Sequence, residues 1–67
     1  MQTLATSATQ EGILKLVDEY YCARAGQGYQ MHALEDAPNV FRLYRADGSP
    51  VRSWVQFRKG RYRFMRD

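Results

Sequence analysis

Arginine and aromatic side chains alternate along the second half of this 67-residue chain, and they are its strongest candidates for chemistry. From Phe41 to Asp67 the sequence is FRLYRADGSPVRSWVQFRKGRYRFMRD. Almost every basic residue in it is arginine, whose planar guanidinium binds phosphate or carboxylate through two parallel hydrogen bonds and stacks on aromatic rings. These residue types suit the binding of an anion better than they suit catalysis.

Charge is divided unevenly between the two halves of the chain. Residues 41–67 carry eight basic and two acidic side chains, a net charge of +6, whereas residues 1–40 carry two basic and five acidic ones, a net charge of −3. The modest overall charge of +3 conceals this split. The split predicts an anionic partner for the C-terminal half, either nucleic acid or an acidic protein surface.

The sequence contains no combination of residues that predicts an enzyme. Cys22 falls on the polar side of a predicted helix near Asp18 and Glu19, whose negative charges disfavour a reactive thiolate. His32, the only histidine, has no second histidine or cysteine nearby with which to form a zinc site. We therefore expect a non-enzymatic protein with no catalytic residue, no cofactor and no metal.

Length and composition predict one small domain. We expect residues 1–6 to form a disordered tail and residues 7–67 to form a single small α+β domain with a thin core. No apolar run approaches the roughly 20 residues that cross a bilayer, and the first residues lack the features of a secretory signal. The expectation is a cytoplasmic protein with no membrane partner, monomeric or homodimeric, of a size typical of mobile-element accessory proteins.

The apolar pattern after residue 7 predicts a helix that ends near Ala25. Ser7 and Gln10 have the spacing of a capping box, with Thr9 as a competing N-cap. Gly26 suits the left-handed position that follows a helix. One helix face gathers Ile13, Leu14, Leu16, Val17, Tyr20 and Tyr21. We expect this face to be buried, above all at Ile13, Leu16, Val17 and Tyr20.

Runs with a two-residue period predict the strands that follow. They lie near Tyr29–Glu35, Val40–Arg45, Pro50–Arg58 and Arg61–Met65. The predicted fold is α+β, with an N-terminal helix packed on one face of a three- to four-stranded antiparallel β-meander.

The length of the first hairpin loop decides which side chains share a sheet face. A two-residue turn at 47–48 would place Leu43 with Trp54, whereas a three-residue loop at 46–48, with Gly48 left-handed, places Leu43 with Val55. We favour the second because it keeps one face apolar. A tight turn at 59–60 completes an inner face of Phe41, Leu43, Val51, Val55, Phe57, Tyr62 and Phe64.

The same register predicts an outer face of arginines and aromatics. It holds Arg42, Tyr44, Arg52, Trp54, Gln56, Arg58, Arg61, Arg63 and Met65, with Lys59 in the adjoining turn. Arg42 is expected opposite Arg52, and Arg58 opposite Arg61. Like charges that face each other across strands are destabilising unless an anion relieves the repulsion.

We expect this outer face to bind nucleic acid, with single strands or RNA favoured. The arginines and Lys59 would contact phosphates, while Trp54 and Tyr44 would stack on bases. A duplex groove is a second geometry for the same charges. The alternative function is a small inhibitor or adaptor, of the anti-CRISPR-like kind that phages or plasmids encode, that docks on a host protein through this face. A solvated face that serves solubility alone is also compatible with the pattern.

Overall fold

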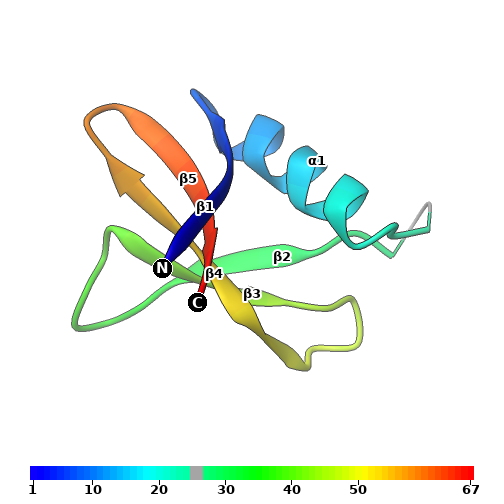
Figure 1. The fold of residues 1–67 in the computed structure, drawn as a ribbon. Coiled ribbons are helices and arrows are strands. Elements are labelled where there is room, and N and C mark those ends of the chain that lie inside the picture. Colours follow the sequence, from blue (N-terminus) through cyan, green and yellow to red (C-terminus); the bar gives the residue numbers. More distant parts are fainter. Residues whose placement is uncertain (25–26) are drawn as a thin grey trace.

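The computed structural model describes residues 1–24 and 27–67, which form one α-helix and five β-strands (Figure 1). In chain order the elements are β1 (Gln2–Ser7), α1 (Gln10–Tyr20), β2 (Gln30–Ala33), β3 (Val40–Tyr44), β4 (Pro50–Arg58) and β5 (Arg61–Arg66). The strands form one antiparallel sheet in the order β1-β5-β4-β3-β2, and α1 packs on one face of it. The α+β class and the antiparallel sheet are confirmed, but the predicted number of strands is too low.

Strand β1 is the element that the sequence pattern does not predict. Residues 1–6 are not a disordered tail and the helix is not N-terminal, because Gln2–Ser7 pairs with β5 and brings the two ends of the chain side by side (Figure 1). A bulge lies between Thr3 and Ala5, and the adjacent Leu4 and Ala5 both pack against the core. Two neighbouring inward residues break the two-residue period that marks a strand.

Helix α1 begins directly after this strand. Thr9 is its N-cap, and the Thr9 hydroxyl accepts a hydrogen bond of 3.0 Å from the backbone N–H of Gly12. The predicted capping residue Ser7 instead ends β1, where its hydroxyl accepts from the N–H of Thr9. A Cβ atom on Gly12 would collide with the Ser7 hydroxyl, so glycine allows the first helical turn to lie against the strand end.

The helix ends five residues earlier than the pattern predicts. Cys22 has a positive φ of 54°, its N–H donates to the carbonyl of Glu19, and the N–H of Ala23 donates to the carbonyl of Asp18. This is the paired hydrogen bonding of a Schellman motif, with cysteine at the left-handed position usually taken by glycine. The Asp18 carboxylate also accepts a 2.8 Å hydrogen bond from the N–H of Tyr29. This bond joins the last turn of α1 to the segment that leads into β2. Gly26, the predicted terminator, lies outside the described residues.

The core lies between α1 and the inner face of the sheet. The fully buried side chains are Ile13, Val17, Leu43, Val55 and Phe64, all of which the sequence predicts. Leu16 is partly buried against them. The prediction is wrong for Tyr20 and Phe57, which are 45% and 37% exposed.

Of the two tyrosines predicted on the apolar helix face, Tyr21 is the one that lies inward. The hydroxyls of Tyr21 and Ser53 share a hydrogen bond of 2.6 Å, which satisfies the one buried polar side chain among the described residues. The Tyr21 ring stacks on Tyr29 with the ring centroids 4.9 Å apart. The N–H of Tyr21 still donates to the carbonyl of Val17 one helical turn earlier, so Tyr21 continues the buried face of Ile13 and Val17 before the chain turns at Cys22.

Both hairpin loops have the predicted lengths. Lys59 and Gly60 have φ values of 53° and 77°, as a two-residue type I′ turn requires, and Val55 pairs with Phe64 as expected. Gly48 has a φ of 90° in the three-residue loop, whose ends are joined by a bond from the Arg45 N–H to the Ser49 carbonyl. Leu43 and Val55 therefore share the inner face.

The register between β3 and β4 then changes in a way that the sequence does not reveal. Tyr44 pairs with Pro50, but Arg42 pairs with Trp54 rather than with Arg52 as predicted. Two extra residues of β4 are accommodated opposite Leu43. An even number of extra residues leaves every side chain on its predicted face but changes its neighbours.

Candidate functional site

The outer face of the sheet, on the side away from α1, carries the predicted binding residues. Arg42 and Tyr44 flank the buried Leu43 in β3, and outward residues alternate with buried ones in the middle of β4. In β5 the outward positions follow from alternation about the buried Phe64. The outer face comprises Arg42, Tyr44, Arg52, Trp54, Gln56, Arg58, Arg61, Arg63 and Met65, and Lys59 lies in the turn between β4 and β5. Strand β1 adds Thr3 beside Met65 and Thr6 beside Arg63. The sequence pattern predicts neither this strand nor the place of these two threonines.

At one end of this face, four consecutive exposed residues form the tip of the β4–β5 hairpin. Arg58 and Arg61 pair across the strands as predicted, and Lys59 and Gly60 connect them. Arg61 reaches the Thr6 hydroxyl at 3.4 Å, a long and weak hydrogen bond. The hairpin tip, residues 58–61, thus gathers three positive charges, and a bound anion would relieve the repulsion between them.

Arg63 lies behind the hairpin tip, between Gln56 of β4 and Thr6 of β1. The side chain is partly buried, and its Nε is the one buried side-chain polar atom without a hydrogen-bond partner among the described residues. A buried donor without a partner loses hydration and gains nothing in exchange. The Nε of Arg63 therefore contributes no hydrogen bond to the fold.

Trp54 occupies the middle of the outer face. It pairs with Arg42 on one side and Met65 on the other, so the three side chains form one row across β3, β4 and β5. Met65 is only 9% exposed, although it belongs to the outer face, because β1 lies on its other side. Trp54 is partly buried and lies between its two cross-strand neighbours.

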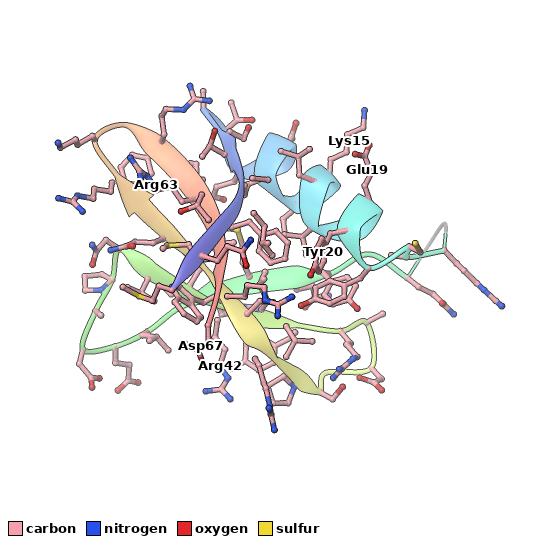
Figure 2. The ribbon with its side chains drawn as sticks, viewed as in Figure 1. Lys15, Glu19, Tyr20, Arg42, Arg63 and Asp67 are labelled. Carbon is pink, nitrogen blue, oxygen red and sulfur yellow. The ribbon has the colours of Figure 1, made fainter. Side chains whose placement is uncertain are left out.

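A pocket of about 330 Å³ opens beside Trp54. Nine residues line it, and they include an indole, two guanidinium groups, several apolar side chains and one carboxylate. Among them are Trp54, Arg42, Arg52, Val40, Leu34 and Asp67. Figure 2 shows Arg42 and Asp67 close together, far from Lys15 and Glu19 on the outward side of α1. Arg52 also borders a second hollow with Tyr20 and Arg66, where Arg66 donates a 3.1 Å bond to the Tyr20 hydroxyl. We call the first hollow the tryptophan pocket.

The second predicted stacking residue, Tyr44, lies apart from this pocket. Its ring meets the ring of His32 edge to face, with the centroids 5.4 Å apart. His32 pairs with Arg42, so the histidine extends the outer face onto β2, a contribution that its isolated place in the sequence did not reveal. The structure therefore brings Trp54 and Arg42 together but not Trp54 and Tyr44.

Acidic side chains lie away from this face, except for Asp67 at the tryptophan pocket. None of the five strands in the described chain contains aspartate or glutamate. The acids lie on α1, in the loops and at the end of β5, at Glu11, Asp18, Glu19, Glu35, Asp36, Asp47 and Asp67. Asp47 is engaged locally: hydrogen bonds from the side chain and backbone of Ser49, with the nearby charge of Arg45, lower the pKa of its carboxyl.

The other reactive side chains to be placed are Cys22 and the potential metal ligands. Cys22 is an exposed free thiol, as predicted, although it lies just beyond the helix rather than on it. Within residues 1–24 and 27–67 no three His, Cys, Asp or Glu side chains gather as a metal site would require. The helix in the described part is too short and too polar to cross a membrane.

Comparison of this chain with models of protein families, with curated proteins and with solved structures gives no match. The functional argument therefore depends on the chain's own residues and their geometry.

Proposed function

We propose that this protein is a non-enzymatic module that binds nucleic acid through the outer face of its sheet, with single strands or RNA loops favoured. The observation that carries the proposal is the composition of that face. Five arginines share this face with a partly exposed tryptophan, on strands that hold no acidic residue, namely Arg42, Arg52, Arg58, Arg61 and Arg63. Cationic grooves with aromatic platforms bind single strands because phosphates need charge and every base has a stacking face.

The arrangement gives each group a distinct role. At the hairpin tip, Arg58, Lys59 and Arg61 are exposed and suited to phosphates. At the centre, Trp54 supplies a ring for stacking, and the Gln56 amide beside it can hydrogen-bond a base edge or a sugar. Tyr44 would support a base only at the far edge of the face, next to His32.

A second candidate, docking on an acidic protein, is favoured by one observation. Trp54 pairs with Met65 and shares its pocket with Val40 and with Leu34, which is 39% exposed. An aromatic anchor among aliphatic side chains and rimmed by arginine has the composition of a protein-binding hot spot. The two candidates differ in their ligand, so they can be separated by experiment.

Titration of a fluorescent single-stranded oligonucleotide at several salt concentrations tests the proposal. If four to six phosphates are neutralised, log K against log salt should slope by roughly −3 to −4, at about −0.7 per phosphate. Arg58→Gln should flatten the slope by nearly one contact, whereas Lys15→Gln, which removes the same charge from the outward side of α1, should not. No binding at micromolar concentration in low salt would reject the nucleic-acid proposal. A pull-down with nuclease treatment would then test for an acidic protein partner.

A further inference from the structure

We infer that the tryptophan pocket is a subsite for a single nucleotide, and that a longer strand runs from it along β4 to the hairpin tip. The inference rests on the proposed function and extends it by assigning the base and the phosphates to separate places. It also predicts how binding should depend on ligand length.

The size and lining of the pocket fit a nucleotide. A volume of about 330 Å³ lies at the lower end of the range for small-molecule sites, which are mostly apolar with a few fixed polar groups. Trp54 supplies a stacking surface, and Val40 and Leu34 supply an apolar wall. Trp54 is already partly buried at a position between Arg42 and Met65, so less side-chain freedom is lost when a base stacks on it than at a fully exposed position.

The charges at the pocket favour a nucleotide over a bare anion. Arg42 lies directly opposite Trp54, and the two extra residues in β4 bring Arg52 to the same pocket. Asp67 also lines it, so the side chains at the pocket sum to a small net positive charge. Inorganic phosphate would gain little from such a site, whereas a nucleotide adds stacking on Trp54 to its contact with the two guanidinium groups.

The hairpin tip lies too far along the strand to serve the same nucleotide. Arg58 follows Trp54 by four residues of β4, which is about 13 Å at roughly 3.3 Å per strand residue. A mononucleotide in the pocket cannot span this length, but an oligonucleotide can. Gln56 and Arg63 form a cross-strand pair between the two places and lie under the proposed path.

A length series on matched ligands tests the inference, with the indole N–H resonance of Trp54, the only tryptophan, as the reporter. A nucleoside monophosphate should shift this resonance, and inorganic phosphate at the same concentration should not. Arg42→Gln should lower the affinity for the mononucleotide severalfold. Arg61→Gln should leave the affinity for the mononucleotide unchanged but lower the affinity for an eight-nucleotide strand. An abasic strand of equal length should bind about 5- to 100-fold more weakly than its base-containing counterpart.

The outcomes separate this inference from the proposed function. If the eight-nucleotide strand binds but the mononucleotide leaves Trp54 unperturbed and the abasic strand binds equally well, the subsite is wrong and the proposed function stands. If Arg61→Gln weakens mononucleotide and strand alike, the separation of base and phosphate sites is wrong. If neither ligand binds at low salt, the proposed function fails and the subsite fails with it.

Discussion

On the face that α1 covers, three adjacent strands contribute the fully buried Leu43, Val55 and Phe64. The residues beside them in the same strands, Arg42, Trp54 and Arg63, point to the outer face. The two faces thus share one backbone and one set of strand pairings. Whatever distinguishes them comes from side chains alone.

The inner face stabilises the fold, whereas the outer face opposes it in places. Burial of aliphatic and aromatic side chains is the main favourable term in folding. On the outer face, Arg58 faces Arg61 across the hairpin, and the Nε of Arg63 is buried without a partner. Neither feature helps the free protein. Residues that do not help the fold are more readily explained by a ligand, and this contrast leads to four predictions.

Ile13→Ala should have the largest effect of the four, and on stability. Ile13 is fully buried at the centre of the core, and truncation of such a side chain costs about 2–5 kcal/mol, much of the stability of a domain this small. Chemical denaturation should show the loss. Leu34→Ala, at a 39% exposed position of the outer side, is the matched control and should leave the unfolding midpoint nearly unchanged. Equal losses in the two variants would mean that the faces do not differ as described.

Trp54→Leu should instead reduce binding while the fold persists. Leucine keeps apolar contact with Met65 but removes the stacking ring, so affinity for a single-stranded oligonucleotide should fall by about 1–3 kcal/mol. The slope of log K against log salt should stay constant, because stacking releases few counterions. Circular dichroism of the variant provides the check on folding. A reduced slope at equal folding would show that Trp54 positions phosphates rather than bases.

Arg61→Gln should leave the stability of the free protein equal or slightly higher. The substitution removes like-charge repulsion from Arg58, worth about 0.2–1 kcal/mol, and loses only a long bond to Thr6. Thermal unfolding in low salt should reveal the gain, and added salt should reduce it through screening. A clear loss of stability would show that the arginines of the hairpin tip serve the fold, which would remove part of the reason for assigning them to a ligand.

The sequence predicts the inner face better than the outer one, for a physical reason. Hydrophobic alternation fixes the face of each residue, and loop chemistry at Gly48 and Lys59 fixes the hairpins, so the core residues of β3, β4 and β5 follow directly. Strand β1 is not predicted, because its bulge places Leu4 and Ala5 on the same side and so breaks the two-residue period. Without that strand the burial of Met65 cannot be foreseen.

The outer face depends on neighbours, which periodicity does not provide. The two extra residues of β4 place Trp54, rather than Arg52, opposite Arg42 without changing any residue's face. The sequence of that stretch does not predict the change of register, since neither glycine nor proline lies between Val51 and Val55. The list of binding residues could therefore be predicted, but the row of Arg42, Trp54 and Met65 and the pocket beside it could not.

The smallest expected effect lies in the loop between β3 and β4, whose shape the sequence predicts correctly. Hydrogen bonds from Ser49 and the charge of Arg45 lower the pKa of Asp47, so its carboxylate is stabilised in the folded state. A lowered folded-state pKa contributes stability that is fully present above the ordinary value of 3.8 and is lost as the pH falls through the folded value. Asp47→Asn mimics the protonated acid, so its melting temperature should lie slightly below that of the wild type at neutral pH. The difference should close as both proteins are acidified below that window.

Ser49→Ala, which removes the hydroxyl donor, should reproduce part of the loss at neutral pH. Because Asp47 is fully exposed and belongs to neither face, neither variant should alter oligonucleotide binding. A difference that persists at low pH would mean that Asp47 acts through the shape of its side chain rather than through its charge.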